Sequence, residues 1–455
     1  MNFQSQTRPV FTNFRWVICG LLFFSTTVNY MDRQVISYLK PFFCADPDTG
    51  GFGWTNSDFA NLTSAFTFFY AGMTLGAGWV IDKIGTKLGL ALSLIVWSIC
   101  GIANAFVGSL VTAHIVIRSA FAVGEAGNFP ASIKTVAEWF PKRERALATA
   151  IFNAGSNSGA MVAALLVPWI MVLFGDQLGW KMAFIITGVL GFPWLIFWFW
   201  LYNSPGKHPR LSKAEYDFIH IDEENAAGVE QNGDKAKKVS WWKLFEYRQL
   251  WAFFMGKFMT DGVWWFYLFW LPDYLIKQFN MTKQQVMMPT FIVYGVAIVG
   301  SIYGGSIPMT LIKRGMPVYK ARMTTMFIIA VFPLFVLLTQ YFGDVGRFGN
   351  MAAVLAVAMI CIGATAHQAW SANLFTTVSD MFPKKTVASV VGIGTAAGGI
   401  GGVIVQKTAG ALTDHFKDTP QTAYLIMFIV CALSYLIAWV IMKALVPRHQ
   451  PITDL

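Results

Sequence analysis

Apolar segments long enough to cross a lipid bilayer recur along almost the whole chain. A spanning helix needs about 20 mainly apolar residues, and about twelve segments meet that need. Only 13% of the 455 residues are charged, whereas soluble domains carry about 25%. Such a chain has too little polar surface to be a soluble enzyme, a nucleic-acid binder or a disordered scaffold. We therefore predict an all-α integral membrane protein with spans at residues 15–39, 58–81, 88–107, 111–139, 146–174, 180–202, 250–277, 285–312, 323–341, 351–378, 386–413 and 422–445.

A polar stretch separates the first six predicted spans from the last six. Within it, Ser212 and Glu215 have the spacing of a capping box, which predicts a short surface helix. The predicted organisation is a cytoplasmic N-terminus (1–14), a first six-helix bundle (15–202), a cytoplasmic linker (203–247), a second six-helix bundle (248–445) and a cytoplasmic tail (446–455).

Lys and Arg are unevenly distributed between the two sides of the predicted spans. The loops on the side of the N-terminus carry several times as many of them as the loops on the other side. Because basic residues favour the cytoplasmic face of a membrane, both termini and the linker are predicted to face the cytoplasm. We expect the chain to lie in the inner (plasma) membrane. Its net charge of +10 then reflects topology rather than a polyanionic partner.

The two halves share a short motif. Phe-Pro-Lys-Arg at 140–143 returns as Phe-Pro-Lys-Lys at 382–385, and the same offset aligns Gly159 with Gly401. Each copy joins one predicted span to the next. Two related six-helix halves with a substrate path between them are typical of secondary transporters. The alternative is chance similarity of two short basic loops, which the matching residues beyond the motif make less favoured.

The loop between the second and third predicted spans reads Gly-Trp-Val-Ile-Asp-Lys-Ile-Gly-Thr-Lys from Gly78 to Lys87. It resembles the Gly-x-x-x-Asp-Arg/Lys-x-Gly-Arg-Lys loop of the major facilitator superfamily. We expect Gly78 and Gly85 to let helix ends approach closely. Asp82 would cap a helix N-terminus or pair with a basic residue of a neighbouring helix. The predicted role is gating, and an ordinary short basic loop is the alternative.

Charged residues lie deep inside three predicted spans: Asp32 and Arg33 in the first, Arg118 and Glu125 in the fourth, and Lys257 and Asp261 in the seventh. Burial of such a group in a bilayer costs at least ~2.5–3.5 kcal/mol, so each needs a partner or a function. Arg118 and Glu125 project from one helix face but lie about 10 Å apart along its axis, too far to bond each other. We therefore expect the ion pairs Asp32–Arg118 and Arg33–Glu125. A static network that locks the first bundle is the alternative, above all for Asp32–Arg118.

Aromatic and polar side chains in other spans form a candidate sugar site, because aromatic faces pack on C–H surfaces while amides and hydroxyls bond OH groups. Each of them is by itself more often a packing residue. The group His367-Gln368-x-Trp370 is harder to dismiss, since polar residues at such depth usually face a cavity. Lys257 and Asp261, four apart on one helix, are expected to pair in a structural role. The candidate substrate contacts are Arg33, Tyr70, Asn157, Trp265, His367, Gln368, Trp370 and Thr395.

Longer motifs make a family resemblance specific. They are Asn-Tyr-Met-Asp-Arg at 29–33, Gly-Glu-Ala-Gly-Asn-Phe-Pro at 124–130, Glu-Trp-Phe-Pro-Lys-Arg-Glu-Arg at 138–145, Trp-Trp-Phe-Tyr-Leu-Phe-Trp-Leu-Pro at 264–272 and Ala-His-Gln-Ala-Trp at 366–370. Through them almost the whole chain resembles the anion:cation symporter family of major facilitator transporters, and most of all its hexuronate transporters. The expected fold is twelve transmembrane helices in two pseudo-symmetric bundles.

The resemblance implies a proton-coupled importer of a sugar acid such as glucuronate or galacturonate. It also implies that Arg33 meets the substrate carboxylate, that Asp32 and Glu125 take part in proton coupling, and that Tyr70 and Trp370 line the site. Arg118 joins the proton-coupling group as the expected partner of Asp32. Two positions depart from the family pattern: Gly262 stands where the family favours proline, and Asp273 where it favours a basic residue.

Other functions remain as alternatives. An exchanger of organic anions or sugar phosphates on the same fold would want more cations in its cavity, whereas here two carboxylates balance two arginines. A membrane enzyme or a non-transporting sensor is less favoured, because the chain has neither a cluster of His, Asp and Glu at a membrane face nor a signalling domain. The five cysteines show no disulfide or metal spacing and no phosphate-binding loop is present, so we expect no cofactor and no metal. We expect a monomer whose partners are the bilayer, protons and a sugar-acid anion.

Overall fold

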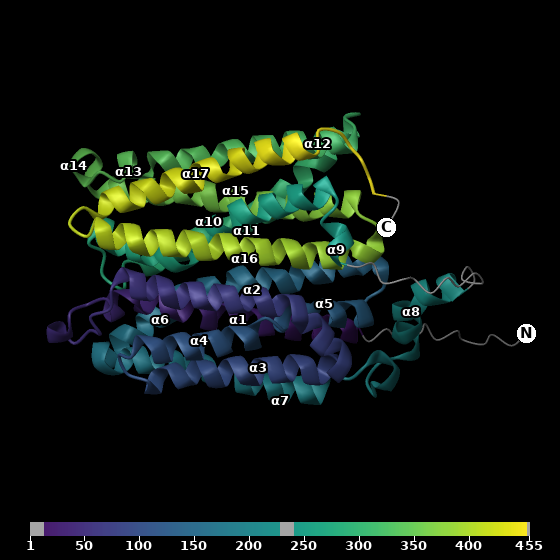
Figure 1. Ribbon diagram of the computed structural model, residues 1–455. Helices are drawn as coiled ribbons and strands as arrows, with labels where there is room; N and C mark the ends of the chain where they lie inside the picture. Colours follow the sequence, from purple (N-terminus) through teal and green to yellow (C-terminus); the bar gives the residue numbers. More distant parts are fainter. Residues whose placement is uncertain (1–12, 228–240, 453–455) are drawn as a thin grey trace, which may run out of the picture.

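The computed structural model describes residues 13–227 and 241–452, and every regular element within them is helical (Figure 1). The helices form two groups that lie side by side. The first group holds α1 (Phe14–Phe43), α2 (Asn56–Ile84), α3 (Thr86–Ala103), α4 (Val111–Glu125), α5 (Asn128–Trp139), α6 (Lys142–Val189) and α7 (Gly191–Leu201). The second group holds α10 (Arg248–Phe279), α11 (Met287–Lys313), α12 (Val318–Val331), α13 (Thr339–Phe342), α14 (Val345–Phe348), α15 (Ala352–Met381), α16 (Lys384–His415) and α17 (Pro420–Leu445).

Each predicted span coincides with helical structure, but several spans depart from a single straight helix. The fourth span is divided into α4 and α5. The fifth span and the start of the sixth are joined in α6, which bends at Gly175, where φ is 68°, and the rest of the sixth span is α7. The ninth span passes from α12 into the 3-10 helix η4 (Phe332–Leu338). Eight helical stretches of the described chain are long and apolar enough by themselves to cross a membrane, while α1 and α10 are similarly long but carry buried charges.

The break between α4 and α5 lies where two glycines approach α3. A Cβ on Gly124 would come within 2.8 Å of the backbone nitrogen of Trp97, and one on Gly127 would overlap the hydroxyl of Ser93. A larger side chain at either position would force the helices apart. The close contact leaves Glu125 as the last residue of α4, with its side chain buried.

The two halves use glycine in the same way at corresponding positions. A Cβ on Gly159 of α6 would overlap the carbonyl oxygen of Thr27 in α1, and one on Gly401 of α16 would overlap that of Phe258 in α10. Both long helices also begin directly after a proline of the repeated motif. One packing unit, α1 on α6, is thus repeated as α10 on α16.

Hydrogen bonds attach the helix of the central linker to the first half. The helix α8 (Lys213–Ala227) starts after Ser212, as the capping-box spacing predicts. Glu215 of α8 is fully buried and accepts hydrogen bonds from the backbone N–H groups of Phe14 and Arg15, at 2.9 and 3.2 Å. These N–H groups belong to the first turn of α1, which has no acceptors within the helix. In Figure 1, α8, α9 (Trp241–Leu244) and the last turn of α17 lie at the same end of the molecule.

Hydrogen bonds join the two halves at the opposite end. Because α1 starts beside α8 and runs to Phe43, the first turn of α2 lies at that far end. There Asp414 of α16 accepts from the backbone N–H groups of Asn56 and Ser57, at 2.9 and 2.7 Å. A carboxylate of the second half therefore accepts hydrogen bonds from backbone N–H groups at the start of α2, which have no acceptor within that helix.

Alanine at Gly159 or Gly401 should lower the thermal stability of the protein. An added methyl group has no room against the backbone of the partner helix, and overpacking of this kind costs about 1–3 kcal/mol. The midpoint of thermal unfolding in detergent should fall by several degrees. Gly72→Ala is the matched control, since a Cβ there meets nothing within 4 Å. Equal midpoints for Gly159→Ala and Gly72→Ala would contradict the close packing.

Candidate functional site

A buried ion pair joins the first span to the fourth. Arg33 of α1 donates through Nε to Oε2 of Glu125, the last residue of α4, at 2.9 Å. The two side chains are 2% and 0% exposed. This pair was expected from the sequence and is confirmed. The other oxygen of Glu125, Oε1, accepts no hydrogen bond from the described residues.

Aromatic rings surround the guanidinium of Arg33. Its central carbon lies 4.3 Å from the ring centroid of Tyr30 and 4.5 Å from that of Tyr70. Phe66 of α2 and Trp265 of α10 follow at 5.3 and 5.6 Å. Such rings attract a cation through the negative charge of their faces. Because Trp265 comes from the second half, Arg33 lies at the interface between the halves.

The second expected pair, Asp32–Arg118, is wrong. Arg118 turns to the backbone and donates through Nη2 to the carbonyl oxygen of Arg33, at 3.1 Å. Asp32 lies beside Trp97 of α3 and Thr187 of α6. Its two carboxylate oxygens accept no hydrogen bond from the described residues, although the side chain is buried. Adjacent residues on a helix point about 100° apart, so Asp32 faces away from the partner that Arg33 holds.

The loop between α2 and α3 shows one of its two expected contacts. Asp82 pairs with Lys134 of α5 at 2.8 Å, and the carboxylate is 72% exposed. The expected close approach at the glycines is wrong, since a Cβ on Gly78 or Gly85 would meet open space. Gly85 is required for another reason: its φ of 83° lies in the left-handed region, which favours glycine.

In the second half, the predicted residues cluster among themselves. His367 bonds through Nδ1 to the hydroxyl of Tyr435 at 2.8 Å, and its ring stacks on Trp264 with centroids 4.9 Å apart. Trp370 is fully buried with its ring nearly perpendicular to that of Tyr435, at 5.6 Å between centroids. The structure brings Tyr70 and Trp265 to Arg33, whereas His367 and Trp370 pack against aromatic side chains of their own half.

The remaining predicted contacts are dispersed. Asn157 is buried on α6 and Gln368 is half-buried on α15. The hydroxyl of Thr395 donates a hydrogen bond to the carbonyl oxygen of Val391 in its own helix, at 2.9 Å. None of these three forms a hydrogen bond with Arg33 or Glu125 in the described structure. Among the described residues, no group of three His, Cys, Asp or Glu side chains could hold a metal ion.

Lys257 and Asp261 form the expected ion pair within α10, at 2.6 Å.

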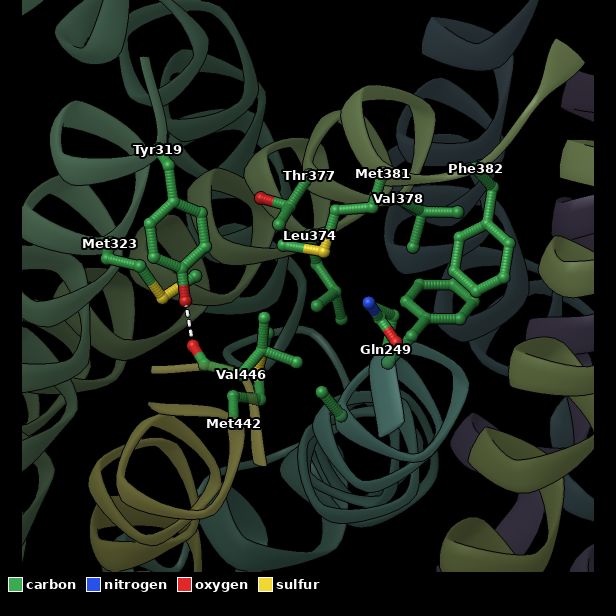
Figure 2. A pocket seen from close by; sticks show the side chains of 12 residues that line it. Gln249, Tyr319, Met323, Leu374, Thr377, Val378, Met381, Phe382, Met442 and Val446 are labelled. Carbon is green, nitrogen blue, oxygen red and sulfur yellow. Dashed lines mark hydrogen bonds between the residues drawn. The ribbon is translucent and has the colours of Figure 1, made fainter. Parts of the chain in front are cut away.

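Towards the end where α8 lies, Figure 2 shows a cavity between α10, α12, α15 and α17. Tyr319 donates across it to the backbone oxygen of Val446. Its lining is mostly apolar and contains none of the predicted site residues. The cavity is therefore separate from the Arg33 site.

Two residues of the Arg33 site were missed by the sequence analysis. Tyr30 lies three residues before Arg33 on the same helix, a spacing that places both side chains on one face. Phe66 lies four residues before Tyr70, and its ring contacts both Arg33 and Arg118, whose guanidinium carbon is 5.2 Å away. The helical spacing could have found both, but only after the position of Arg33 against α2 was known.

Comparison with known proteins agrees with this architecture. The sequence model of the Major Facilitator Superfamily matches residues 22–406. The chain belongs to this superfamily. Among its relatives, the hexuronate transporter of Escherichia coli strain K12 is 30% identical over 432 residues, which cover 94% of each chain. The D-galactonate transporter of Escherichia coli O6:H1 is 25% identical over 429 residues, 93% of this chain and 95% of that one.

Solved major facilitator structures share the fold. A crystal structure of a bacterial homologue of the human lysosomal transporter Spinster matches with a TM-score of 0.72 and 17% identity, over 98% of this chain and 100% of that chain. Membership of the superfamily makes this chain a multi-pass membrane transporter rather than an enzyme. The all-α major facilitator fold with two six-helix bundles, expected from the sequence, is confirmed.

Removal of one partner of the Arg33–Glu125 pair should destabilise this transporter more than removal of both. Glu125→Met leaves a buried cation without its anion, which costs about 3–5 kcal/mol. Arg33→Met combined with Glu125→Met replaces the pair with apolar volume and should recover most of that loss. Thermal unfolding in detergent measures the difference. If Glu125→Met alone is as stable as the double variant, the pair does not contribute in this way.

Proposed function

We propose that the chain is a proton-coupled symporter that imports a sugar acid, with a hexuronate such as glucuronate or galacturonate as its substrate. The observation that carries the proposal is the buried Arg33–Glu125 pair at the interface of the two halves. The names of the relatives, which transport hexuronate and D-galactonate, support the same substrate class.

In this proposal the substrate carboxylate takes the place of the Glu125 carboxylate on Arg33. A guanidinium presents a planar fork that matches a carboxylate with two parallel hydrogen bonds. Tyr70 and Trp265, already at Arg33, would pack on the C–H faces of the sugar ring. The further substrate contacts we propose, formed when the halves close on the sugar, are Asn157, His367, Gln368, Trp370 and Thr395.

The proton would act through the carboxylates beside Arg33. Neutral Glu125 releases Arg33 to the substrate, and ionised Glu125 competes with the substrate for it. Proton and substrate binding would therefore be cooperative. Asp32 is the alternative carrier: it is buried and forms no ion pair in the part of the chain that the structure describes, and a buried carboxylate without an opposite charge is costly while it is ionised. Arg118, which lies close to both Asp32 and Glu125, would balance the negative charge of these carboxylates.

Transport would proceed by alternating access, with residues 15–202 and 248–445 as the two bundles that move relative to each other. The linker (203–247), both termini and the loop with Gly78, Asp82 and Gly85 would face the cytoplasm, in the plasma membrane of the cell. The exposed Asp82–Lys134 pair would open and re-form as the cytoplasmic side opens and closes. Nothing in this cycle requires more than one chain.

The experiment that tests the proposal is uptake of labelled glucuronate, galacturonate and galactonate into proteoliposomes, with and without an imposed pH gradient. Uphill accumulation that follows the gradient is the expected result. An exchanger would instead show counterflow of substrate with no accumulation driven by the pH gradient. Accumulation of none of these sugar acids would overturn the proposed substrate class.

Arg33→Lys should weaken substrate binding by at least about tenfold, or about 1.4 kcal/mol, although the positive charge is kept. The ammonium of lysine lacks the planar fork that a carboxylate engages. Tryptophan fluorescence, recorded while glucuronate is titrated into the purified variant, measures the change in affinity. An affinity equal to that of the unchanged protein would show that the carboxylate binds elsewhere.

Glu125→Gln should uncouple transport from the proton gradient. Glutamine resembles the protonated carboxyl, so the variant should bind substrate and exchange it across the membrane, yet lose uphill accumulation. The same assay on Asp32→Asn separates the two candidate carriers. If Glu125→Gln still concentrates substrate under a pH gradient and Asp32→Asn does not, Asp32 is the carrier.

A further inference from the structure

A second cation lies on α1 beyond Arg33. Lys40 is completely buried, and its Nζ lies 2.5 Å from Oδ2 of Asp273 in α10. Its ammonium also lies 3.9 Å from the ring centroid of Trp270. Because α1 and α10 belong to different halves, this ion pair crosses their interface. It lies at the end opposite α8, close to the last turn of α1.

Asp273 is held by more than one donor. Lys277 of the same helix reaches its Oδ2 at 3.2 Å, and the hydroxyl of Tyr424 in α17 also bonds to that oxygen. Lys277 extends in turn to Oδ1 of Asn56 in α2, at 3.2 Å. The carboxylate of Asp273 would therefore keep partners in the second half if the two halves separated at this end. Lys40 would lose the one carboxylate with which it forms an ion pair in the described structure.

Lys40 and Arg33 lie on the same face of α1. They are seven residues apart, which is two helical turns less about 20°, and about 10.5 Å along the axis. Each cation contacts aromatic rings, and each holds a carboxylate of the protein itself. The two sites are therefore built alike, one at the middle of the interface and one nearer its outer end.

We propose that Lys40 is an outer binding position for the substrate carboxylate, which Asp273 occupies while the outer end is closed. When the halves part at that end, Lys40 loses Asp273 and Trp270, keeps the ring of Phe59 in its own half, 5.4 Å away, and faces the opening as a cation without its ion-pair partner. A sugar acid arriving from outside replaces Asp273 on Lys40, and its carboxylate then passes along the same helix face to Arg33. The proposal rests on the proposed function, since it takes a sugar-acid anion as the substrate.

A different role would fit the same contact: a simple latch that closes the outer end. The two roles differ in the effect of removing each partner. Breaking a latch from either side gives the same result. For a binding position, loss of Lys40 removes the site, while loss of Asp273 removes the internal competitor of the substrate.

The test measures the apparent external KM for labelled glucuronate in intact cells that make the full chain and lack other hexuronate carriers. Lys40→Met should raise this KM about tenfold, which corresponds to about 1.4 kcal/mol. Asp273→Asn should leave it unchanged or lower it. Lys40→Arg, which keeps a cation at this position, should stay within about threefold of the unchanged protein, a change of about 0.65 kcal/mol.

The amount of Lys40→Met in the membrane and its elution profile in detergent are the controls for folding and should match those of the unchanged protein. Equal changes of the external KM in Lys40→Met and Asp273→Asn would overturn the binding position in favour of the latch. An unchanged external KM in Lys40→Met would also overturn it. Failure of the unchanged protein to transport any sugar acid would instead overturn the proposed function, so the two failures are distinguishable.

Discussion

The ion pair between Arg33 and Glu125 is the constraint on which the arrangement of the site depends. A buried charge in a membrane protein is costly unless it is paired, so α1 and α4 must bring these two side chains together. The glycines that end α4 against α3 leave Glu125 at the helix terminus, and Gly159 lets α6 lie against the backbone of α1. Close helix packing and charge pairing thus both determine where Arg33 and Glu125 lie.

The pair lies at the boundary between two similar halves rather than inside one of them. Trp265 of α10 faces Arg33 of α1, so a movement of the halves changes the surroundings of the cation. Lys40 and Asp273 repeat this relation nearer the end opposite α8, again with α1 and α10 as the two helices. On α1, Arg33 and Lys40 therefore lie where the second half approaches, and each has a carboxylate of the protein near it.

Much of this could be predicted from the sequence, because hydropathy and charge act locally along a helix. The length of the apolar segments located the spans, and depth in the bilayer required a partner for Arg33, which left Glu125 as the choice. The Asp32–Arg118 pair failed because spacing along a helix gives the face of a side chain but not the competing backbone acceptor, here the carbonyl oxygen of Arg33. The contacts of His367 with Trp264 and Tyr435 depend on how three helices meet, which no local pattern encodes. Asp273 appeared as a departure from a family pattern, and only the fold shows that Lys40 compensates for it.

Charge balance connects the site to the proposed coupling. Arg33 and Arg118 are matched in number by Asp32 and Glu125, so the buried group is formally neutral when all four are ionised. A sugar-acid anion that binds to Arg33 adds one negative charge to a region of low polarity, where uncompensated charge is expensive. A proton on either carboxylate restores neutrality at no further cost in buried charge. In the proposed cycle the loaded site and the empty site are then both neutral, and the state to be avoided is the one with substrate but without a proton. Coupling of this kind needs no separate gate for the proton, because the same low polarity that makes the ion pair necessary also disfavours the uncoupled state.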